Sequence, residues 1–431
     1  MKEQLTNLGF DTLSIHAGQQ PDSDTHSMST PIYQTTAYEF ESAQHARELF
    51  ELKASGNIYS RIMNPTCDTL ERRVAALDGG IAALSMSSGH AAILATILNL
   101  ANAGDEIVSS INIYGGAINL LGVTLKNIGI NVKFVNADDP EEWEAAITDK
   151  TRALFFEVVG NPNANVADIE AIAAIGHRHG IPVIADSTFT TPYLCRPIAL
   201  GADIIVHSAT KFLGGHGNSM AGVIVDSGNF NFADNPRFPQ YNTPDISYHG
   251  LVFARDCGNA GFITRLRVLI LRDLGACLSP FNAFLILQGI ETLPLRMQRH
   301  CDNTLKVAQY LEQNDAVSFV NYPGLPGNPY HALAKKQMPN GAGAVFTFGL
   351  KGGREAGVRF IDSLKLISNV ANVGDVRSLV IHPATTTHSQ LSDEQLRAVE
   401  ISADTVRLSI GIEDVNDIIA DLEQAIRAAT R

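Results

Sequence analysis

Two short apolar segments that each lead into a chemically reactive side chain most constrain how this chain folds. Residues 181–186 read Ile-Pro-Val-Ile-Ala-Asp and end in Asp186, and residues 202–206 read Ala-Asp-Ile-Ile-Val and lead to Lys211. Short runs rich in β-branched residues and bounded by turn residues are typical of buried strands. In a parallel sheet, ligands bind beyond the carboxyl ends of the strands. We therefore expect Asp186 and Lys211 to lie together at that edge of a sheet.

The same alternation of strand-like and helix-like segments extends over residues 66–260. Apolar periodicity predicts helices over 70–77, 91–100 and 168–179, and strands over 106–110, 131–135 and 153–158. Strands that alternate with helices form mostly parallel sheets. The sequence therefore predicts an α/β fold with a mostly parallel sheet.

The chain of 431 residues is too long for one compact core, and its patterning divides it into three parts. Residues 1–65 are polar and rich in turn residues, and they predict an N-terminal arm. Residues 66–261 form the predicted large domain, with a polar, turn-rich insertion loop at about 227–261. Residues 262–431 begin with long helical patterns and predict a smaller α+β C-terminal domain.

Composition excludes several classes of function. The net charge of −13 opposes binding to nucleic acid, because a phosphate backbone attracts basic surfaces. No apolar run is long enough to span a bilayer, and the N-terminus lacks the apolar core of a signal peptide. The five cysteines have no C-x-x-C spacing and the thirteen histidines no H-x-x-x-H spacing, so we expect reduced thiols and no metal site. We expect a cytoplasmic protein with small-molecule substrates and no membrane or nucleic-acid partner.

A lysine beside hydroxyl groups and an acid on the preceding strand form a pair that one cofactor requires. Pyridoxal phosphate binds a lysine through its aldehyde and an acid through its pyridine nitrogen. Ser208 and Thr210, beside Lys211, can donate hydrogen bonds to its phosphate. Taken alone, Lys211 could be a solvated loop lysine and Asp186 a helix N-cap. Their spacing of about 25 residues, on consecutive strand–helix units, favours the cofactor site.

Two further segments are candidates for cofactor contacts. Ser88, Gly89 and His90 begin a predicted helix, where backbone N–H groups bind phosphate, although serine-rich N-caps are also common without a ligand. Tyr114 follows the predicted strand 106–110 and is either a ring that stacks on a flat cofactor or a core tyrosine.

Two arginines are candidates for binding anions. Arg407 interrupts an apolar strand pattern over 405–410, and an arginine that faces inward needs an anionic partner. That partner is either a substrate carboxylate or a structural ion pair. Arg61 lies close to Tyr59 in the arm, and it is either a phosphate ligand or an exposed arginine.

Several short motifs together carry a resemblance to a known family. They are Tyr59-Ser60-Arg61, Asn64-Pro65-Thr66, Ser87-Ser88-Gly89, Tyr114-Gly115, Asn161-Pro162, Asp186, Ser208-Ala209-Thr210-Lys211, His382-Pro383-Ala384 and Val406-Arg407-Leu408-Ser409. From about Leu13 to Arg427 the chain resembles the Cys/Met-metabolism family of pyridoxal-phosphate enzymes, the γ-family related to cystathionine γ-synthase and methionine γ-lyase. The resemblance implies the PLP-dependent transferase fold of type I, similar to aspartate aminotransferase. That fold has a mostly parallel seven-stranded sheet between helices and a smaller α+β C-terminal domain.

The resemblance also implies a role for each candidate residue. Lys211 is expected to form an imine with the cofactor, Asp186 to pair with the pyridine nitrogen, and Tyr114 to stack on the ring. The implied phosphate ligands are Ser88, Gly89, His90, Ser208 and Thr210, with Tyr59 and Arg61 reaching the phosphate of a neighbouring subunit. Asn161 is implied to lie near the ring hydroxyl, and Arg407 to bind the substrate α-carboxylate. Asn372, Tyr59 and Tyr114 also belong to the implied substrate site, and the implied catalytic residues are Lys211, Tyr114, Asp186 and Tyr59.

Within the family, the chain is most similar to the O-acetylhomoserine sulfhydrylases. The segments 238–251, 322–325, 371–375 and 383–388 carry this similarity. It implies γ-replacement on O-acetyl-L-homoserine by sulfide or a thiol, in methionine biosynthesis, by a homotetramer built as a dimer of dimers with shared active sites. The alternatives are γ-elimination of the methionine γ-lyase or cystathionine γ-lyase type, and a γ-synthase that uses O-succinylhomoserine.

Individual residues bear on the choice among these reactions. Gly116 stands where the lyase branch usually has cysteine, so Gly116 and Asn372 argue against elimination. His90 stands where glutamine or methionine is usual, and Ala117-Ile118 replaces the commoner Thr-Tyr. Both departures fall on the expected wall of the active site.

Overall fold

The computed structural model describes residues 8–386 and 402–430, and its largest element is a seven-stranded sheet. The strand order is β1-β7-β6-β5-β4-β2-β3. Strand β7 runs antiparallel to both β1 and β6, and every other pair is parallel. The strands are β1 (Ala82–Met86), β2 (Glu106–Ser110), β3 (Asn131–Val135), β4 (Thr151–Glu157), β5 (Val183–Asp186), β6 (Ile204–Ser208) and β7 (Gly222–Asp226). The predicted α/β fold with a mostly parallel sheet is confirmed.

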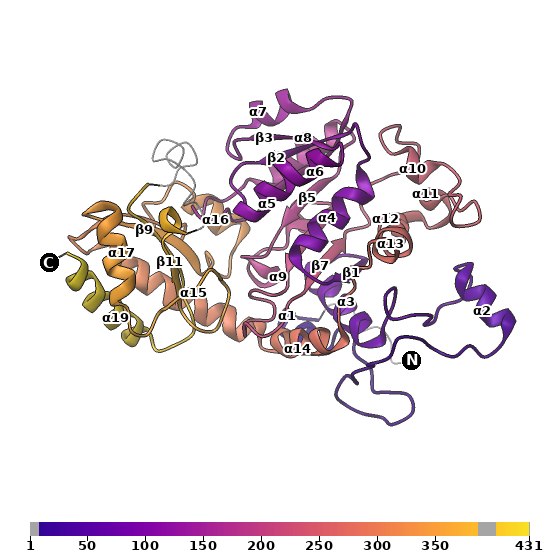
Figure 1. Ribbon diagram of the computed structural model, residues 1–431, viewed down its shortest axis with the longest axis horizontal. Helices are drawn as coiled ribbons and strands as arrows, with labels where there is room; N and C mark the ends of the chain where they lie inside the picture. Colours follow the sequence, from indigo (N-terminus) through magenta and orange to yellow (C-terminus); the bar gives the residue numbers. More distant parts are fainter. Residues whose placement is uncertain (1–7, 387–401, 431) are drawn as a thin grey trace.

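Helices cover both faces of this sheet (Figure 1) because its strands carry apolar side chains on both sides. Ala185 and Ile205 point to one face, whereas Ile184 and Val206 belong to the core on the other. The first face is covered by α3 (Pro65–Asp78), α8 (Ile169–Arg178) and α14 (Pro280–Glu291). The second is covered by α4 (Gly89–Leu100), the helical segment 115–127 and the helical segment 261–274.

Capping residues fix where the helices around the site begin. Helix α3 starts at Pro65 behind the N-cap Asn64, whose side chain accepts the Thr66 N–H. It ends at Asp78, followed by the C-cap Gly79 in the left-handed conformation. Helix α4 has Ser88 as its N-cap, with the Ser88 hydroxyl accepting the Ala91 N–H. The predicted starts of these two helices, at 70 and 91, therefore fall inside helices that begin earlier.

A second sheet of five strands lies beside the first, in the order β10-β11-β12-β9-β8. Its strands are β8 (Val317–Asn321), β9 (Val345–Leu350), β10 (Ser368–Asn369), β11 (Leu379–Ile381) and β12 (Thr405–Ser409). Phe346, Phe348 and Leu408 share a core with α15 (Leu293–Glu312), α17 (Gly353–Ser363) and α19 (Val415–Ala429). The alternate residues of β9 and β12, among them Thr347 and Arg407, therefore point away from these helices.

One long helix belongs to the cores of both sheets. The first turns of α15 place Leu293, Met297 and Cys301 in the core of the seven-stranded sheet. Its later turns place Val307 and Leu311 in the core of the five-stranded sheet. The division into an arm (1–65), a large domain (66–261) and a C-terminal domain (262–431) stays a prediction. Because residues 262–301 pack onto the large sheet, we propose that the second boundary lies within α15.

The segment at 227–261 is a packed structure around an aromatic cluster. It contains α10 (Pro239–Asn242) and α11 (Phe253–Asp256). Phe232 stacks on Tyr241 with ring centroids 4.3 Å apart, and the Tyr241 hydroxyl donates to the Asn99 carbonyl in α4. These contacts fix the segment to the outer end of α4.

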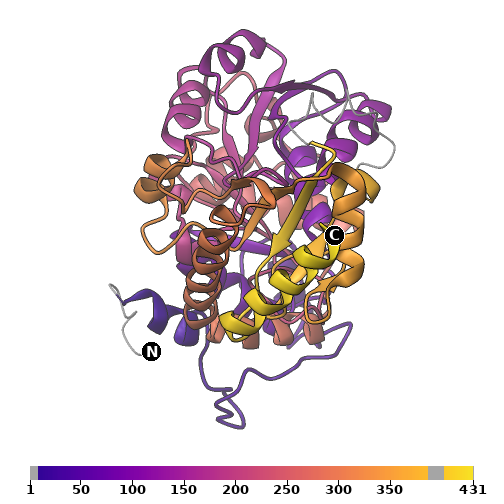
Figure 2. The ribbon, with the colours of Figure 1, turned by 90° about the vertical axis from the view of Figure 1, so that its left-hand side faces the viewer.

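The N-terminal region extends away from the body. Helix α1 (Phe10–His16) packs against α3 and α14, whereas the chain that follows reaches outward and carries α2 (Ala43–Phe50), as Figures 1 and 2 show. Residues 387 and 388 of the segment 383–388 lie outside the described part of the chain, as do residues 1–7 of the arm. None of the described helices combines the length and the apolar character needed to cross a membrane.

Candidate active site

A cavity of about 370 Å³ opens at the carboxyl ends of β4, β5 and β6. It is lined by residues from both sheets and from the N-terminus of α4. The predicted site residues in its wall are Ser88, Gly89, His90, Tyr114, Asn161, Asp186, Ser208, Thr210, Lys211, Asn372 and Arg407. The structure thus brings together eleven of the thirteen candidate residues, as expected for ligands bound at the strand ends of a parallel sheet.

Lys211 lies in the turn that follows β6, and its backbone N–H donates to the Ser208 carbonyl. Its ammonium group donates a hydrogen bond to Oδ1 of Asn372. Burial and the nearby Arg407 guanidinium lower the pKa of Lys211. A lowered pKa increases the fraction of neutral amine, and the neutral amine is the form that attacks an aldehyde.

Two carboxylates end neighbouring strands in the wall of the cavity. Asp186 at the end of β5 pairs in register with Glu157 at the end of β4, and both side chains are buried. Burial raises the pKa of Asp186, and burial together with Asp186 raises the pKa of Glu157 well above its usual range. Asp186 accepts the Thr188 N–H at 2.9 Å, and Glu157 accepts the Tyr114 N–H at 2.7 Å. The direction of these shifts favours a proton on Glu157 over one on Asp186.

Glu157 is a site residue that sequence reasoning missed. It ends β4 as Asp186 ends β5, and it lies one residue before the end of the strand predicted over 153–158, so a similar signal was present. Smaller residues that complete the wall were also missed, and they carry no distinctive pattern. They are Ile93, Val159, Thr188, Phe189 and Met220. Ala117 lines the cavity as expected, together with Ala371 and Val373 from the segment 371–375.

The start of α4 and the end of β6 come into close contact and form a candidate binding site for an anion. A Cβ atom on Gly89 would lie 2.7 Å from Cβ of Ser208, so only glycine allows this approach. The first N–H groups of a helix have no acceptor within the helix, and Ser88, Gly89 and His90 at the start of α4 line the cavity. The Thr210 hydroxyl donates to the Ala221 carbonyl at 3.2 Å, which holds the next turn in place.

Tyr114 lies at the mouth of the cavity and is 47% exposed, so it is not a core tyrosine. It forms the N-cap position of α5 (Gly115–Asn119), immediately before Gly115 and Gly116. Its ring meets the His90 ring edge-on, with centroids 5.7 Å apart and an interplanar angle of 88°. A Cβ on Gly116 would lie 2.5 Å from the Tyr114 ring, so glycine is required there for this orientation.

Arg407 on β12 is buried in the wall of the cavity opposite the strand ends. It donates to Oδ1 of Asn161 at 3.0 Å and to the Asn372 carbonyl at 3.3 Å. No salt bridge joins Arg407 to a carboxylate within residues 8–386 and 402–430, so the alternative of a structural ion pair is not met there. Burial lowers the pKa of Arg407 to about 10. A buried cation without an anion favours an anionic ligand.

Tyr59 and Arg61 do not line the cavity of their own chain. Arg61 lies over the Tyr59 ring at 5.4 Å from its centroid and donates to the Arg272 carbonyl at 2.8 Å. Tyr59 itself is exposed. The expectation that these two residues reach the site of a neighbouring subunit stays a prediction.

The donor set of the cavity fits pyridoxal phosphate. A buried amine with a lowered pKa suits its aldehyde, a buried carboxylate suits its ring nitrogen, and a helix N-terminus with two hydroxyl groups suits its phosphate. Each of these groups lines one cavity, and none of the charged groups is neutralised by a protein salt bridge in the described chain. We propose the corresponding roles for Lys211, Asp186, Ser88, Gly89, His90, Ser208 and Thr210.

Comparison with known proteins gives the class of this protein. The chain matches the model of the family "Cys/Met metabolism PLP-dependent enzyme" over residues 11–427. The chain therefore belongs to this family, and its cofactor is pyridoxal phosphate.

Individual relatives cover nearly the whole chain. It is 51% identical to "O-acetyl-L-homoserine sulfhydrylase 1" of Thermus thermophilus, over 97% of this chain and 99% of the relative. It is 48% identical to "Homocysteine/cysteine synthase" of Saccharomyces cerevisiae, over 96% of this chain and 97% of the relative. A crystal structure of a putative O-acetylhomoserine (thiol)-lyase from Campylobacter jejuni, which contains N'-pyridoxyl-lysine-5'-monophosphate, superposes with a TM-score of 0.94 at 43% identity. It covers 97% of this chain and 100% of its own.

The raised pKa of Glu157 predicts a particular pH dependence of stability. Above its usual pKa, Glu157 ionises in the unfolded chain but stays protonated in the folded chain, so stability falls as the pH rises toward the folded pKa. Glu157→Gln removes this loss, which amounts to about 1.4 kcal/mol per pH unit. In thermal unfolding of the cofactor-free protein, the stability of Glu157→Gln relative to wild type should therefore increase from pH 5 to pH 8.

Glu312→Gln, at the exposed end of α15, is the matched control for the same chemical change at the surface. A constant or decreasing difference for Glu157→Gln would mean that Glu157 is ionised in the folded protein.

Proposed function

We propose that this protein catalyses a γ-replacement on O-acetyl-L-homoserine. Sulfide forms a bond to Cγ, the Cγ–oxygen bond breaks, and the products are L-homocysteine and acetate; a thiol in place of sulfide gives the thioether. The observation that carries the proposal is the cavity that joins Lys211, Asp186 and Arg407, which forms no salt bridge with a carboxylate in the described part of the chain. Full-length relatives near 50% identity that are named for this chemistry support it. The step belongs to methionine biosynthesis.

Different residues of the chain have different roles in this reaction. Pyridoxal phosphate, when bound, withdraws electrons from the substrate Cα and so acidifies its proton. Arg407 binds the α-carboxylate with its two-pronged guanidinium, and this contact orients Cα within the cavity. Lys211, whose pKa is lowered, accepts the Cα proton and returns it. Asp186 provides the negative charge that keeps the ring nitrogen protonated.

Reaction with the activated substrate tests the proposal directly. Purified protein loaded with cofactor is given O-acetyl-L-homoserine with and without sulfide, and homocysteine, acetate and 2-oxobutanoate are measured. The proposal predicts equal amounts of homocysteine and acetate when sulfide is present. It also predicts that Arg407→Lys raises KM for the amino acid about tenfold or more, because lysine lacks the fork that binds a carboxylate.

Other products would identify other reactions. Release of 2-oxobutanoate as the main product would show γ-elimination, and turnover of O-succinyl-L-homoserine in preference to the acetyl ester would show a γ-synthase. Either result would contradict the proposal.

We further propose that the protein is a cytoplasmic homotetramer, a dimer of dimers, whose active sites are shared between subunits. The outward-reaching arm supports shared sites, because it carries Tyr59 and Arg61 away from the cavity of its own chain. All five cysteines are free, which is typical of a reducing compartment.

Complementation between two inactive variants tests the sharing of sites. In a mixed dimer of Arg61→Ala and Lys211→Ala, one site combines intact Lys211 of one chain with intact Arg61 of the other. Random pairing makes half of the dimers mixed, each with one good site, so roughly a quarter of wild-type activity should return. Each variant alone is the control. Mixed dimers without recovered activity would show that each site is built from one chain.

A further inference from the structure

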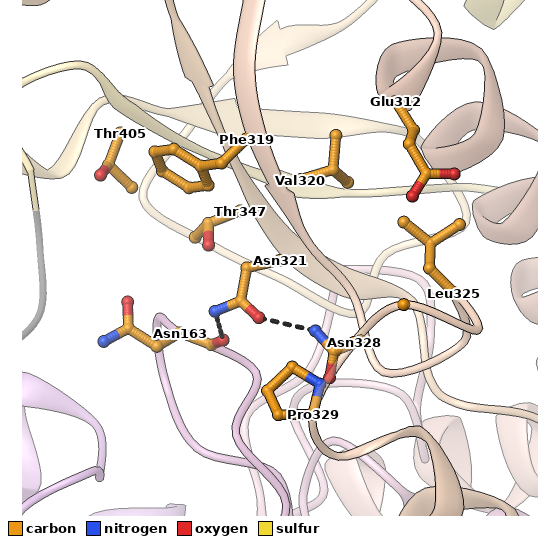
Figure 3. Close-up of a pocket in the computed structure, with 11 residues that line it drawn as sticks. Asn163, Glu312, Phe319, Val320, Asn321, Leu325, Asn328, Pro329, Thr347 and Thr405 are labelled. Atoms are coloured by element: carbon orange, nitrogen blue, oxygen red, sulfur yellow. Dashed lines mark hydrogen bonds between the residues drawn. The ribbon is translucent and has the colours of Figure 1, made fainter.

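A second cleft, of about 310 Å³, lies between the loop that follows β4 and the five-stranded sheet (Figure 3). Its wall includes Asn163, from the loop that follows β4, and Asn321 and Asn328, from the region of β8. Thr347 and Thr405, from β9 and β12, lie on the same side of the five-stranded sheet. The cleft therefore marks where the loop after β4 meets that sheet.

Three residues of the five-stranded sheet form one row across neighbouring strands. Asn321 on β8 pairs in register with Thr347 on β9, and Thr347 pairs in register with Arg407 on β12. Residues in register on adjacent strands project to the same face of a sheet. The row therefore places Asn321 and Arg407 on the face that meets the loop.

Both ends of this row bind the same short loop. Arg407 donates to the side chain of Asn161 at 3.0 Å, and the amide of Asn321 donates to the backbone carbonyl of Asn163. The two bound positions are two residues apart in the loop. Because Asn161 also lines the active-site cavity, the position of this loop affects both the cavity wall and the direction of the Arg407 guanidinium.

The amide of Asn321 is held in one orientation by a second amide. Asn328 donates from Nδ2 to Oδ1 of Asn321 at 2.9 Å, and Oδ1 of Asn328 accepts the Tyr330 N–H at 2.9 Å. With its oxygen occupied in this way, Asn321 presents its NH₂ group to the loop, as Figure 3 shows. The chain of contacts runs from the backbone near α16 (His331–Gln337) to the wall of the active site.

We propose that Asn321, oriented by Asn328, is a positioning residue for recognition of the substrate α-carboxylate. By binding the carbonyl of Asn163, it holds Asn161 where that side chain accepts a hydrogen bond from Arg407. The Arg407 guanidinium group is thereby directed into the cavity. The inference rests on the proposed role of Arg407. It adds a specific function to a residue that touches neither cofactor nor substrate.

Other contacts already hold the two sheets together, so Asn321 is not needed for that purpose. Gln337 accepts the Ile169 N–H and donates to the Ala167 carbonyl, and Asn340 donates to the Tyr193 carbonyl at 2.8 Å. Asn340 thus makes the same kind of amide-to-carbonyl contact between the same two regions, but away from the loop after β4. Asn340→Ala is therefore a matched control.

A pair of ligands that differ only in the carboxylate tests the proposal. L-norvaline and n-butylamine, its counterpart without the carboxylate, are titrated into the cofactor-loaded protein, and binding is followed by the change in cofactor absorbance. Asn321→Ala should weaken norvaline binding about fivefold, the effect of one neutral hydrogen bond, and leave butylamine binding unchanged. KM for the amino-acid substrate should rise by the same factor while kcat stays within about twofold. Asn321→Asp, which has the same shape but cannot donate, should show at least the same loss.

Two further variants distinguish a positioning role of Asn321 from a general loss of structure. Asn340→Ala should bind both ligands as wild type does, and Asn321→Ala should add no further loss in an Arg407→Lys background. Equal weakening of norvaline and butylamine by Asn321→Ala, or losses that add in the double variant, would overturn the proposal. If Arg407→Lys itself bound norvaline normally, the proposed role of Arg407 would fail instead, and binding measurements show this without turnover.

Discussion

The parallel alignment of β4, β5 and β6 is the constraint on which the site depends. Register pairing brings Glu157 beside Asp186, and the turn after β6 brings Lys211 to the same edge. Neighbouring strands of a sheet lie about 4.8 Å apart, so groups at their ends are held at more precise separations than groups on long loops. Apolar side chains on both faces of these strands bury the sheet between helices, and this packing holds the edge rigid.

Charge balance explains why such a cavity needs a ligand. Two cationic side chains, Lys211 and Arg407, and two acids, Asp186 and Glu157, line it, yet within the described chain none forms a salt bridge with another protein group. Burial lowers the pKa of Lys211 and Arg407 and raises the pKa of Asp186 and Glu157. Both directions favour the neutral form of the group. A ligand with a phosphate, a ring nitrogen and a carboxylate supplies the opposite charges, so its binding offsets the cost of burying these groups.

Local patterns in the sequence predicted much of this arrangement. The bounds of β2 and β3 are those expected from their apolar runs, and Asp186 and Lys211 meet as their places at strand ends predicted. Strands β1 and β7 were not predicted, because the antiparallel position of β7 between β1 and β6 depends on pairing partners far apart in the sequence. Asn321 and Asn163 are 158 residues apart, and no local periodicity links them. The arm shows the opposite limit: Tyr59 and Arg61 belong to the family motifs, but neither lines the cavity of its own chain, where Arg61 donates to the Arg272 carbonyl.

Chemical trapping tests most directly whether Lys211 binds the cofactor covalently, as we propose. Reduction of the loaded protein with borohydride fixes a pyridoxyl phosphate group on the lysine that holds it, and mass spectrometry of the proteolytic peptides locates that lysine. We expect one pyridoxyl group per chain, on the peptide that contains Lys211, and none on this peptide in Lys211→Arg. A pyridoxyl group on a different lysine of the wild-type protein, or unchanged labelling of Lys211→Arg, would contradict it.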